Sequence, residues 1–300
     1  MNIWGIDLGG TKIECAVLNK QSLEVILRKR IPTEAEKGYS HILNQIKRLI
    51  AEISEALNEA PIQIGFGTPG VLEPETGTMK NCNTTCLNGK PLKKDLEEML
   101  GHPVRMANDA NCFALAETLL GAGRDFPATA VVFGIIMGTG VGGGLVVHQK
   151  IINGHHGIAG EWGHNLLEYN GAPCYCGRKG CVETVISGPS LERKYKELTG
   201  VSLKLNKILE LHLEKSDQAA SDVIERLLEN FGKSVATLIN IIDPDLIIVG
   251  GGVGNVDLLY SEGYERIKKF VFNNGKFTTP LCKPKLGDSA GVFGAALLWN

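Results

Sequence analysis

Residues 3–18 read IWGIDLGGTKIECAVL, in which two apolar runs at 3–7 and 12–18 enclose a pair of glycines. A third apolar run at 23–31 follows the polar turn Asn-Lys-Gln-Ser. Short runs of this kind separated by turn residues are typical of neighbouring antiparallel strands. The sequence therefore predicts a three-stranded meander at its start.

The same order of elements returns later in the chain. Apolar residues recur at three- and four-residue steps between Gly38 and Pro61, which predicts an amphipathic helix, and a buried strand is expected at 62–66. Further strands are expected at 131–137, 143–148 and 246–249, with helices near 190–198 and 221–241. Two similar α/β halves are the simplest interpretation.

Composition excludes several classes of partner. The 300 residues suffice for two domains, and 31 basic against 33 acidic side chains give a net charge of -2. Broad attraction to nucleic acid or to an anionic membrane is not expected from such a balance. The first residues lack a signal peptide, and the uncharged stretch 128–147 contains six glycines, so it predicts two buried strands rather than a membrane span. We expect a cytoplasmic protein.

Glycine is in excess, with 37 residues, and three glycine-rich turns follow predicted strands, at 7–12, 138–144 and 250–254. Successive backbone amides in such turns can converge on phosphate oxygens, although tight turns alone also use glycine. The second turn satisfies the Gly-x-Gly-x-x-Gly pattern of dinucleotide-binding proteins. That pattern requires a helix to follow, whereas Leu145-Val146-Val147 predicts a strand. No Walker phosphate loop occurs either.

A candidate metal site lies in the second half of the chain. Cys174, Cys176 and Cys181 are closely spaced, and His164 precedes them by ten residues. Three thiolates and one imidazole suit tetrahedral zinc. Reduced, unligated thiols are the alternative interpretation, and His155 and His156 are rival fourth ligands.

Three carboxylates stand near these motifs. Asp109 follows a short predicted strand and begins an apolar helix, where capping the helix is the simplest role. Glu161 and Glu183 flank the cysteines, and their position alone fits either an enclosed site or ordinary surface charge.

Taken together, the motifs resemble those of the ROK family of bacterial sugar kinases and sugar-responsive repressors, over nearly the whole chain. The resemblance rests on Asp7-Leu8-Gly9-Gly10-Thr11-Lys12, Asn108-Asp109-Ala110-Asn111, Gly138-Thr139-Gly140-Val141-Gly142, Glu161-Trp162-Gly163-His164 and Cys174-x-Cys176-Gly177-x-x-Gly180-Cys181-x-Glu183. It implies a ribonuclease-H-like α/β fold of the actin and hexokinase type, with two domains and an interdomain cleft for sugar and nucleotide. We expect a small α/β domain at 1–109 plus 286–300 and a large α/β domain at 110–285 that carries the zinc loop.

The resemblance also implies roles for individual residues. Asp109 would be the general base that takes the proton of a sugar hydroxyl as ATP transfers its γ-phosphoryl group. The zinc would be structural, with the ligands His164, Cys174, Cys176 and Cys181. The implied sugar contacts are Asn83, Asn108, Asp109, Glu161, His164 and Glu183. The implied contacts to ATP and Mg²⁺ are Asp7, Gly9, Gly10, Thr11, Lys12, Gly138, Thr139, Gly140, Val141, Gly142, Gly143, Gly251 and Gly252.

The loops indicate which sugar to expect. The segments Asn83–Leu92, Ala159–His164 and Gly287–Val292 look most like those of the fructokinase and mannokinase members. We therefore expect a fructose kinase that also accepts mannose or glucose at the 6-hydroxyl. The segment from Asn108 to Leu115 is shared with the N-acetylglucosamine kinases, and an N-acetylglucosamine or N-acetylmannosamine kinase is the alternative. The stretch between His164 and Cys174 is shorter than in the manno(fructo)kinases. A homodimer is expected from the resemblance, and a sugar-binding regulator without catalysis is a further alternative.

Overall fold

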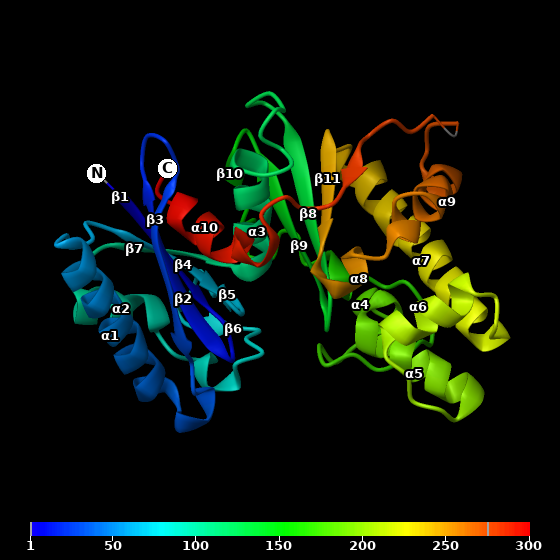
Figure 1. Cartoon of the computed structure of the whole chain (residues 1–300), viewed down its shortest axis with the longest axis horizontal. Coiled ribbons are helices and arrows are strands. Elements are labelled where there is room, and N and C mark those ends of the chain that lie inside the picture. Colours follow the sequence, from blue (N-terminus) through cyan, green and yellow to red (C-terminus); the bar gives the residue numbers. More distant parts are fainter. Residues whose placement is uncertain (1, 275) are drawn as a thin grey trace. The chain divides into compact units, whose positions relative to one another are not determined.

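The computed structural model describes residues 2–274 and 276–300 (Figure 1). The chain forms two compact units. The first comprises Met1–Phe126, Gly144–Ala159 and Lys285–Asn300, and the second comprises Pro127–Gly143 and Gly160–Pro284.

These units divide the chain differently from the expected domains, since residues 110–126 and 144–159 also belong to the first unit. Helix α3, Asp109–Leu119, lies wholly in the first unit, because helix α10, Ala290–Leu297, packs directly on it. The approach is so close that a Cβ added at Gly294 would lie 1.8 Å from the carbonyl oxygen of Cys112. The functional domain boundaries stay a prediction.

The first unit is built on a five-stranded sheet in the order β3-β2-β1-β4-β7. Strands β1, β2 and β3 pair antiparallel in sequence order, whereas β4 lies parallel to β1 and β7 parallel to β4. The predicted meander is therefore confirmed. The strands are β1 Asn2–Leu8, β2 Lys12–Asn19, β3 Val25–Pro32, β4 Ile64–Thr68 and β7 Val104–Asn108.

A second five-stranded sheet repeats this order as β10-β9-β8-β11-β12. Strand β9 pairs antiparallel with β10, and β11 lies parallel to both β8 and β12. In each sheet, three strands consecutive in the sequence lie side by side, and two later strands extend the sheet in parallel to the first of the three. The predicted α/β class with two similar halves is therefore confirmed. The strands are β8 Val131–Met137, β9 Val141–Val147, β10 Lys150–Ile151, β11 Leu246–Gly250 and β12 Leu281–Cys282.

The helices of the first unit bury their apolar faces against its sheet. Helix α1, Tyr39–Leu57, buries one face that includes Ile42, Ile46 and Leu49, as the spacing of its apolar residues predicts. Helix α10, red in Figure 1, packs on the central strands β1 and β4, although it ends the chain. The other elements of this unit are α2 Leu92–Leu100, the hairpin β5 Val71–Leu72 and β6 Met79–Lys80, and the short 3₁₀ turns Ala35–Lys37, Thr85–Leu87 and Gly287–Ser289.

Part of the glycine excess serves this packing rather than ligand binding. A Cβ at Gly5 of β1 would lie 2.3 Å from the backbone nitrogen of Ala296, and one at Gly65 of β4 would lie 1.8 Å from the carbonyl oxygen of Ala295. Only glycine at these two positions lets α10 rest directly on the sheet backbone. Helix α10 in turn brings its first turn to the end of β1.

The long helix α7, Gln218–Ile242, dominates the second unit and packs on α9, Glu262–Phe270. The pattern predicted near 221–241 is thus confirmed as part of a longer helix that begins with Asp217 as its N-cap. The other helices are α4 Glu183–Ile186, α5 Gly188–Thr199, α6 Leu205–Leu213 and α8 Gly251–Gly254, with the 3₁₀ turns Trp162–His164 and Asp257–Leu259. Among the described residues, no helix has the length and apolar character needed to cross a bilayer.

A buried carboxylate fixes the point at which the chain returns to the first unit. Glu117 near the end of α3 is inaccessible to solvent, and it accepts backbone hydrogen bonds from Ala122, Lys285 and Leu286 at 2.8 to 3.0 Å. A buried carboxylate that accepts several N–H groups is well compensated for its desolvation. Glu117 thus ties the segment that leads into α10 to the helix that begins at Asp109.

Candidate active site

The turn between β1 and β2 carries the first predicted phosphate loop. Asp7 is a half-buried residue next to the end of β1, and the Gly9 amide donates to the Lys12 carbonyl at 2.9 Å, which closes a tight turn. The first turn of α10 lies against Asp7, since a Cβ at Gly291 would be 3.1 Å from its Oδ2. A helix N-terminus favours negative charge, so the fold supports a carboxylate here.

The electrostatic surroundings of Asp7 are nevertheless unfavourable to its charged form. The pKa of Asp7 is raised from 3.8 to about 6, mainly by burial; the negative charges of Asp109 and Glu14 contribute to this rise, and the cations Lys12 and Arg30 oppose it. A carboxylate whose charged form is destabilised in this way is a candidate ligand for a cation, because a bound cation would stabilise the charged form.

Replacing Asp7 by Asn should therefore stabilise the folded chain at neutral pH. Because the pKa of Asp7 in the folded chain lies above its ordinary value, the folded chain loses stability as the pH rises from about 4 to 6. The rise of this pKa from 3.8 to about 6 corresponds to about 3 kcal/mol of unfolding free energy. We expect Asp7→Asn to raise the free energy of unfolding at pH 7.5 by about 2 to 3 kcal/mol, and by much less at pH 4. Urea unfolding at both pH values measures this, with the exposed Glu75→Gln as control. A variant equally stable to wild type at pH 7.5 would contradict the unfavourable burial of Asp7.

Asp109 lies at the junction of β7 and α3, and the structure separates it from the capping role. Asn108 is the N-cap of α3, and its Oδ1 accepts the Asn111 amide at 2.8 Å. Asp109 follows in the first helical turn, where its Oδ1 accepts the Ala110 amide at 2.8 Å. Desolvation raises the pKa of the Asp109 carboxyl, although its backbone hydrogen bonds oppose this. Asn108 therefore caps the helix, which is the role that the sequence alone suggested for Asp109.

Asn83 belongs to the same unit as Asp7 and Asp109. It is exposed and precedes Thr84, whose Oγ1 would meet a Cβ at Gly10 at 3.2 Å. The structure thus places the segment around Asn83 beside the first glycine turn. His155 and His156 also lie in this unit, where their rings meet edge to face with centroids 4.6 Å apart.

The second phosphate loop connects β8 to β9 in the second unit. The Gly138 amide donates to the Gly140 carbonyl at 2.9 Å and the chain continues directly as a strand, so the dinucleotide-binding interpretation is excluded as predicted. The third glycine turn, after β11, lies beside the start of this loop. Gly251 has a positive φ of 84°, and a Cβ there would lie 2.3 Å from the Met137 carbonyl oxygen, so glycine is required.

Glu183 connects this loop to the cysteine segment. Its Oε2 accepts the Val141 amide at 2.9 Å, and a Cβ at Gly140 would lie 2.5 Å from the same oxygen. Trp162 is buried and donates from Nε1 to the Gly142 carbonyl at 3.0 Å, which holds the segment of Glu161 and His164 against the loop. The structure therefore brings the second glycine turn, Glu183 and the Glu161 segment together in one unit.

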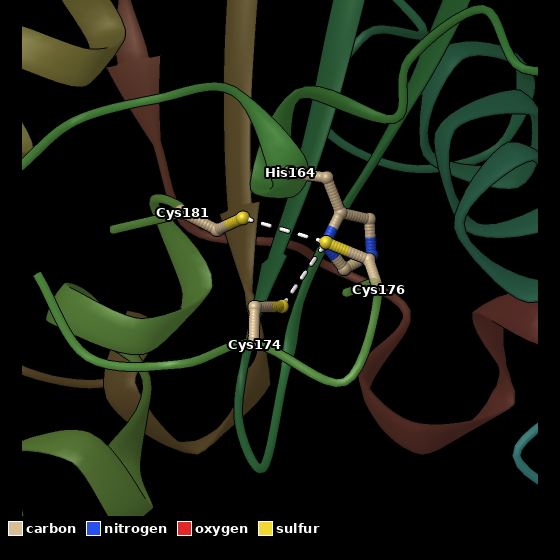
Figure 2. A group of neighbouring side chains, drawn as sticks. All are labelled: His164, Cys174, Cys176 and Cys181. Atoms are coloured by element: carbon tan, nitrogen blue, oxygen red, sulfur yellow. Dashed lines mark hydrogen bonds between the residues drawn. The ribbon is translucent and has the colours of Figure 1, made fainter. Parts of the chain in front are cut away.

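The predicted zinc ligands converge on one point (Figure 2). The ligand atoms of His164, Cys174, Cys176 and Cys181 all lie within 4.8 Å of one another. Cys176 Sγ is 3.6 Å from Cys181 Sγ, and Cys174 Sγ is 3.6 Å from His164 Nδ1. Tetrahedral ligands about 2.3 Å from zinc are separated by about 3.7 Å, so the donor set fits the ion in both chemistry and size. Backbone hydrogen bonds support the loop, with the Cys174 amide donating to Arg178 and the Gly177 amide to Cys174.

One side chain of this site was not singled out in the sequence. The hydroxyl of Tyr175 lies 3.0 Å from His164 Nε2, on the side of the imidazole away from the thiolates. The pKa of Tyr175 is raised to about 12, first because the surrounding residues partly desolvate its hydroxyl and then because of the negative charges of Glu183 and Glu161. Its position between two cysteines was the available signal, but spacing does not tell where an intervening side chain turns.

Known proteins resemble this chain along its full length. An N-acetyl-D-glucosamine kinase of Histophilus somni is 39% identical over 308 aligned positions, covering 99% of this chain and 98% of that protein. Further curated relatives, 35 to 38% identical, carry the same description.

Solved structures show the same architecture. A ROK hexokinase of Thermus thermophilus matches with a TM-score of 0.88 at 29% identity, covering 99% of this chain and 97% of that one. A ROK family glucokinase of Streptomyces griseus, in complex with glucose and AMPPNP, matches with a TM-score of 0.78 at 27% identity and 99% coverage of both chains. The expected actin and hexokinase type of fold is confirmed.

The expectation of fructose as the substrate is wrong. It rested on loop similarity, foremost at Asn83–Leu92, whereas the full-length relatives reported above are N-acetyl-D-glucosamine kinases. The Asn108–Leu115 segment, which is shared with such kinases, was the better signal. The loop around Asn83 meets the first glycine turn, so its sequence is constrained by that contact and is a poor guide to the sugar.

The family itself is settled by a match along the chain. The model of the ROK family matches residues 3–300, which include both sheets and every motif described above. This chain belongs to the ROK family.

Proposed function

We propose that this chain transfers the γ-phosphoryl group of ATP to the 6-hydroxyl of N-acetyl-D-glucosamine. The full-length likeness to N-acetyl-D-glucosamine kinases, at 39% identity, is the observation that carries the proposal. The three glycine turns, the carboxylates Asp7 and Asp109, and the Cys and His cluster supply the residue types that such a reaction requires. A homodimer and a cytoplasmic location stay predictions.

Asp109 is the proposed general base. Asp109 is an exposed residue, although the protein around its carboxyl desolvates it and raises its pKa, which makes it a better proton acceptor. The Ala110 amide fixes its position in the first turn of α3. Phosphoryl transfer needs positioning and charge stabilisation more than covalent chemistry, so one well-placed carboxylate is sufficient. Asp7 is the proposed carboxylate for Mg²⁺, since a bound cation would favour its charged form.

The remaining contacts fall into sets with distinct chemistry. Carboxylates and amides suit the hydroxyls of a sugar, which both donate and accept hydrogen bonds; the proposed sugar contacts are Asn83, Asn108, Asp109, Glu161, His164 and Glu183. Backbone amides and hydroxyls of glycine turns suit phosphates; the proposed contacts to ATP and Mg²⁺ are Asp7, Gly9, Gly10, Thr11, Lys12, Gly138, Thr139, Gly140, Val141, Gly142, Gly143, Gly251 and Gly252. Zinc held by His164, Cys174, Cys176 and Cys181 would fix the orientation of the His164 ring.

A panel of sugars tests the proposal. ADP release from Mg-ATP is measured with N-acetylglucosamine, N-acetylmannosamine, glucose, mannose and fructose in parallel. We expect kcat/KM for N-acetylglucosamine to exceed that for each other sugar at least tenfold, which is about 1.4 kcal/mol of transition-state discrimination. Another sugar in the lead would refute the assigned substrate, and no ADP release with any sugar would favour a sugar-binding regulator.

A further inference from the structure

Tyr175 occupies a position that the proposed roles leave unexplained. It lies between two of the proposed zinc ligands, yet its side chain is 76% exposed. Its hydroxyl is 3.0 Å from His164 Nε2, and the two rings meet edge to face with centroids 5.1 Å apart. A large exposed aromatic side chain held by one specific hydrogen bond, beside residues proposed to bind sugar, is suited to ligand contact.

The donors and acceptors of the neighbouring side chains define what Tyr175 can offer. A metal bound at His164 Nδ1 leaves the ring hydrogen on Nε2, where the Tyr175 oxygen accepts it and a sugar hydroxyl can share it. The phenol hydrogen is then available for a further bond. Ionised Glu161 and Glu183 can only accept, and the Val141 amide already donates to Glu183. Of the side chains of His164, Tyr175, Glu161 and Glu183, Tyr175 is thus the one with a hydrogen not already donated within this group.

The carbonyl oxygen of an acetamido group requires such a donor, whereas the N–H of that group can donate to a carboxylate. The carbonyl oxygen accepts hydrogen bonds and has no hydrogen to offer, so a carboxylate cannot bind it, whereas a hydroxyl in place of the acetamido group can donate to a carboxylate. We propose that Tyr175 is a specificity-determining residue whose hydroxyl donates to the acetamido carbonyl of the sugar, with its exposed ring beside the acetyl methyl group. This assignment rests on the proposed function and on the proposed zinc ligands.

The test compares two sugars in Tyr175→Phe, which removes only the hydroxyl. Tyr169→Phe is the matched control, because Tyr169 is a phenol of the same segment with 86% exposure. We expect Tyr175→Phe to raise KM for N-acetylglucosamine about tenfold, equivalent to about 1.4 kcal/mol, with kcat within twofold of wild type. KM for glucose, the zinc content and the melting temperature should stay unchanged, and Tyr169→Phe should behave as wild type. Calorimetric titration with each sugar gives the same comparison where turnover is slow.

Other results would overturn the assignment. Equal weakening of N-acetylglucosamine and glucose would mean that Tyr175 only orients His164, and loss of zinc would mean that it supports the metal loop. Unchanged binding of both sugars would mean that it contacts neither. These results leave the sugar preference of the wild-type chain intact, whereas a wild-type chain that ignores N-acetylglucosamine would remove the proposed function together with this role.

Discussion

Asp109→Asn should lower kcat for sugar phosphorylation by about a thousandfold or more and leave sugar binding nearly unchanged. The amide has the size and shape of the carboxylate, but it cannot take the proton of the sugar hydroxyl. Positioned proton transfer contributes about a hundredfold to ten-thousandfold, and a thousandfold is about 4 kcal/mol of barrier. Initial rates of ADP release under saturating Mg-ATP measure the effect.

The surroundings of Asp109 indicate that Asp109→Asn leaves the fold unchanged. Asn108, and not Asp109, caps α3, and the Ala110 amide can donate to the Asn oxygen as it does to Oδ1. We therefore expect the melting temperature to stay within a few degrees of wild type. The calorimetric Kd for N-acetylglucosamine should stay within about threefold of wild type. Asp125→Asn, in the exposed loop after α3, is the matched control and should keep full activity. Near-normal turnover in Asp109→Asn would remove Asp109 as the base.

The pH dependence of wild-type activity provides an independent check. Desolvation raises the pKa of Asp109, and burial together with neighbouring charges raises that of Asp7 to about 6. Both proposed roles require the ionised form, so an acid limb in kcat/KM near pH 6 would agree with them.

Local sequence patterns predicted most of the fold because the relevant forces act locally. The meander at the start follows from three short apolar runs, and the residues Leu145 to Val147 correctly indicated a strand after the second glycine turn. Repetition of strand order in the second sheet was visible for the same reason. The close spacing of three cysteines likewise predicted the convergence of their sulfur atoms.

Contacts between distant parts of the chain were not predictable in this way. Glu117 binds the amides of Lys285 and Leu286, which lie 168 and 169 residues further on, and no periodicity encodes that pairing. The packing of Gly294 on Cys112 likewise assigns α3 to the first unit. Tyr175 was missed because the direction of its side chain depends on the loop geometry around His164. The sugar was mistaken since loop similarity reflects contacts within the fold as well as contacts to substrate.

Removing one thiolate should cost the chain both its metal and a measurable part of its stability. Cys176 Sγ lies 3.6 Å from Cys181 Sγ within the four-ligand cluster, so we expect Cys176→Ser to lower zinc from one equivalent per chain to nearly none. The cluster joins the His164 turn to the segment that leads into α4, and backbone hydrogen bonds such as that from the Val182 amide to Asn165 also connect the two, so we expect the chain to be weakened but to stay folded. A loss of a few kcal/mol corresponds to a fall in Tm of roughly 10 °C.

The loss of zinc should also weaken sugar binding while leaving the chemical step in place. With Nδ1 no longer held, the His164 ring can rotate and its hydrogen bond to Tyr175 is lost. We expect KM for N-acetylglucosamine to rise about tenfold or more, with a smaller change in kcat. Cys86→Ser, in the first unit, is the matched control and should retain the metal, as measured by plasma mass spectrometry of the purified chains. Zinc retained at one equivalent in Cys176→Ser, or absent from the wild-type chain, would refute the proposed ligand set, because three thiolates and one imidazole leave no spare donor to replace the missing sulfur.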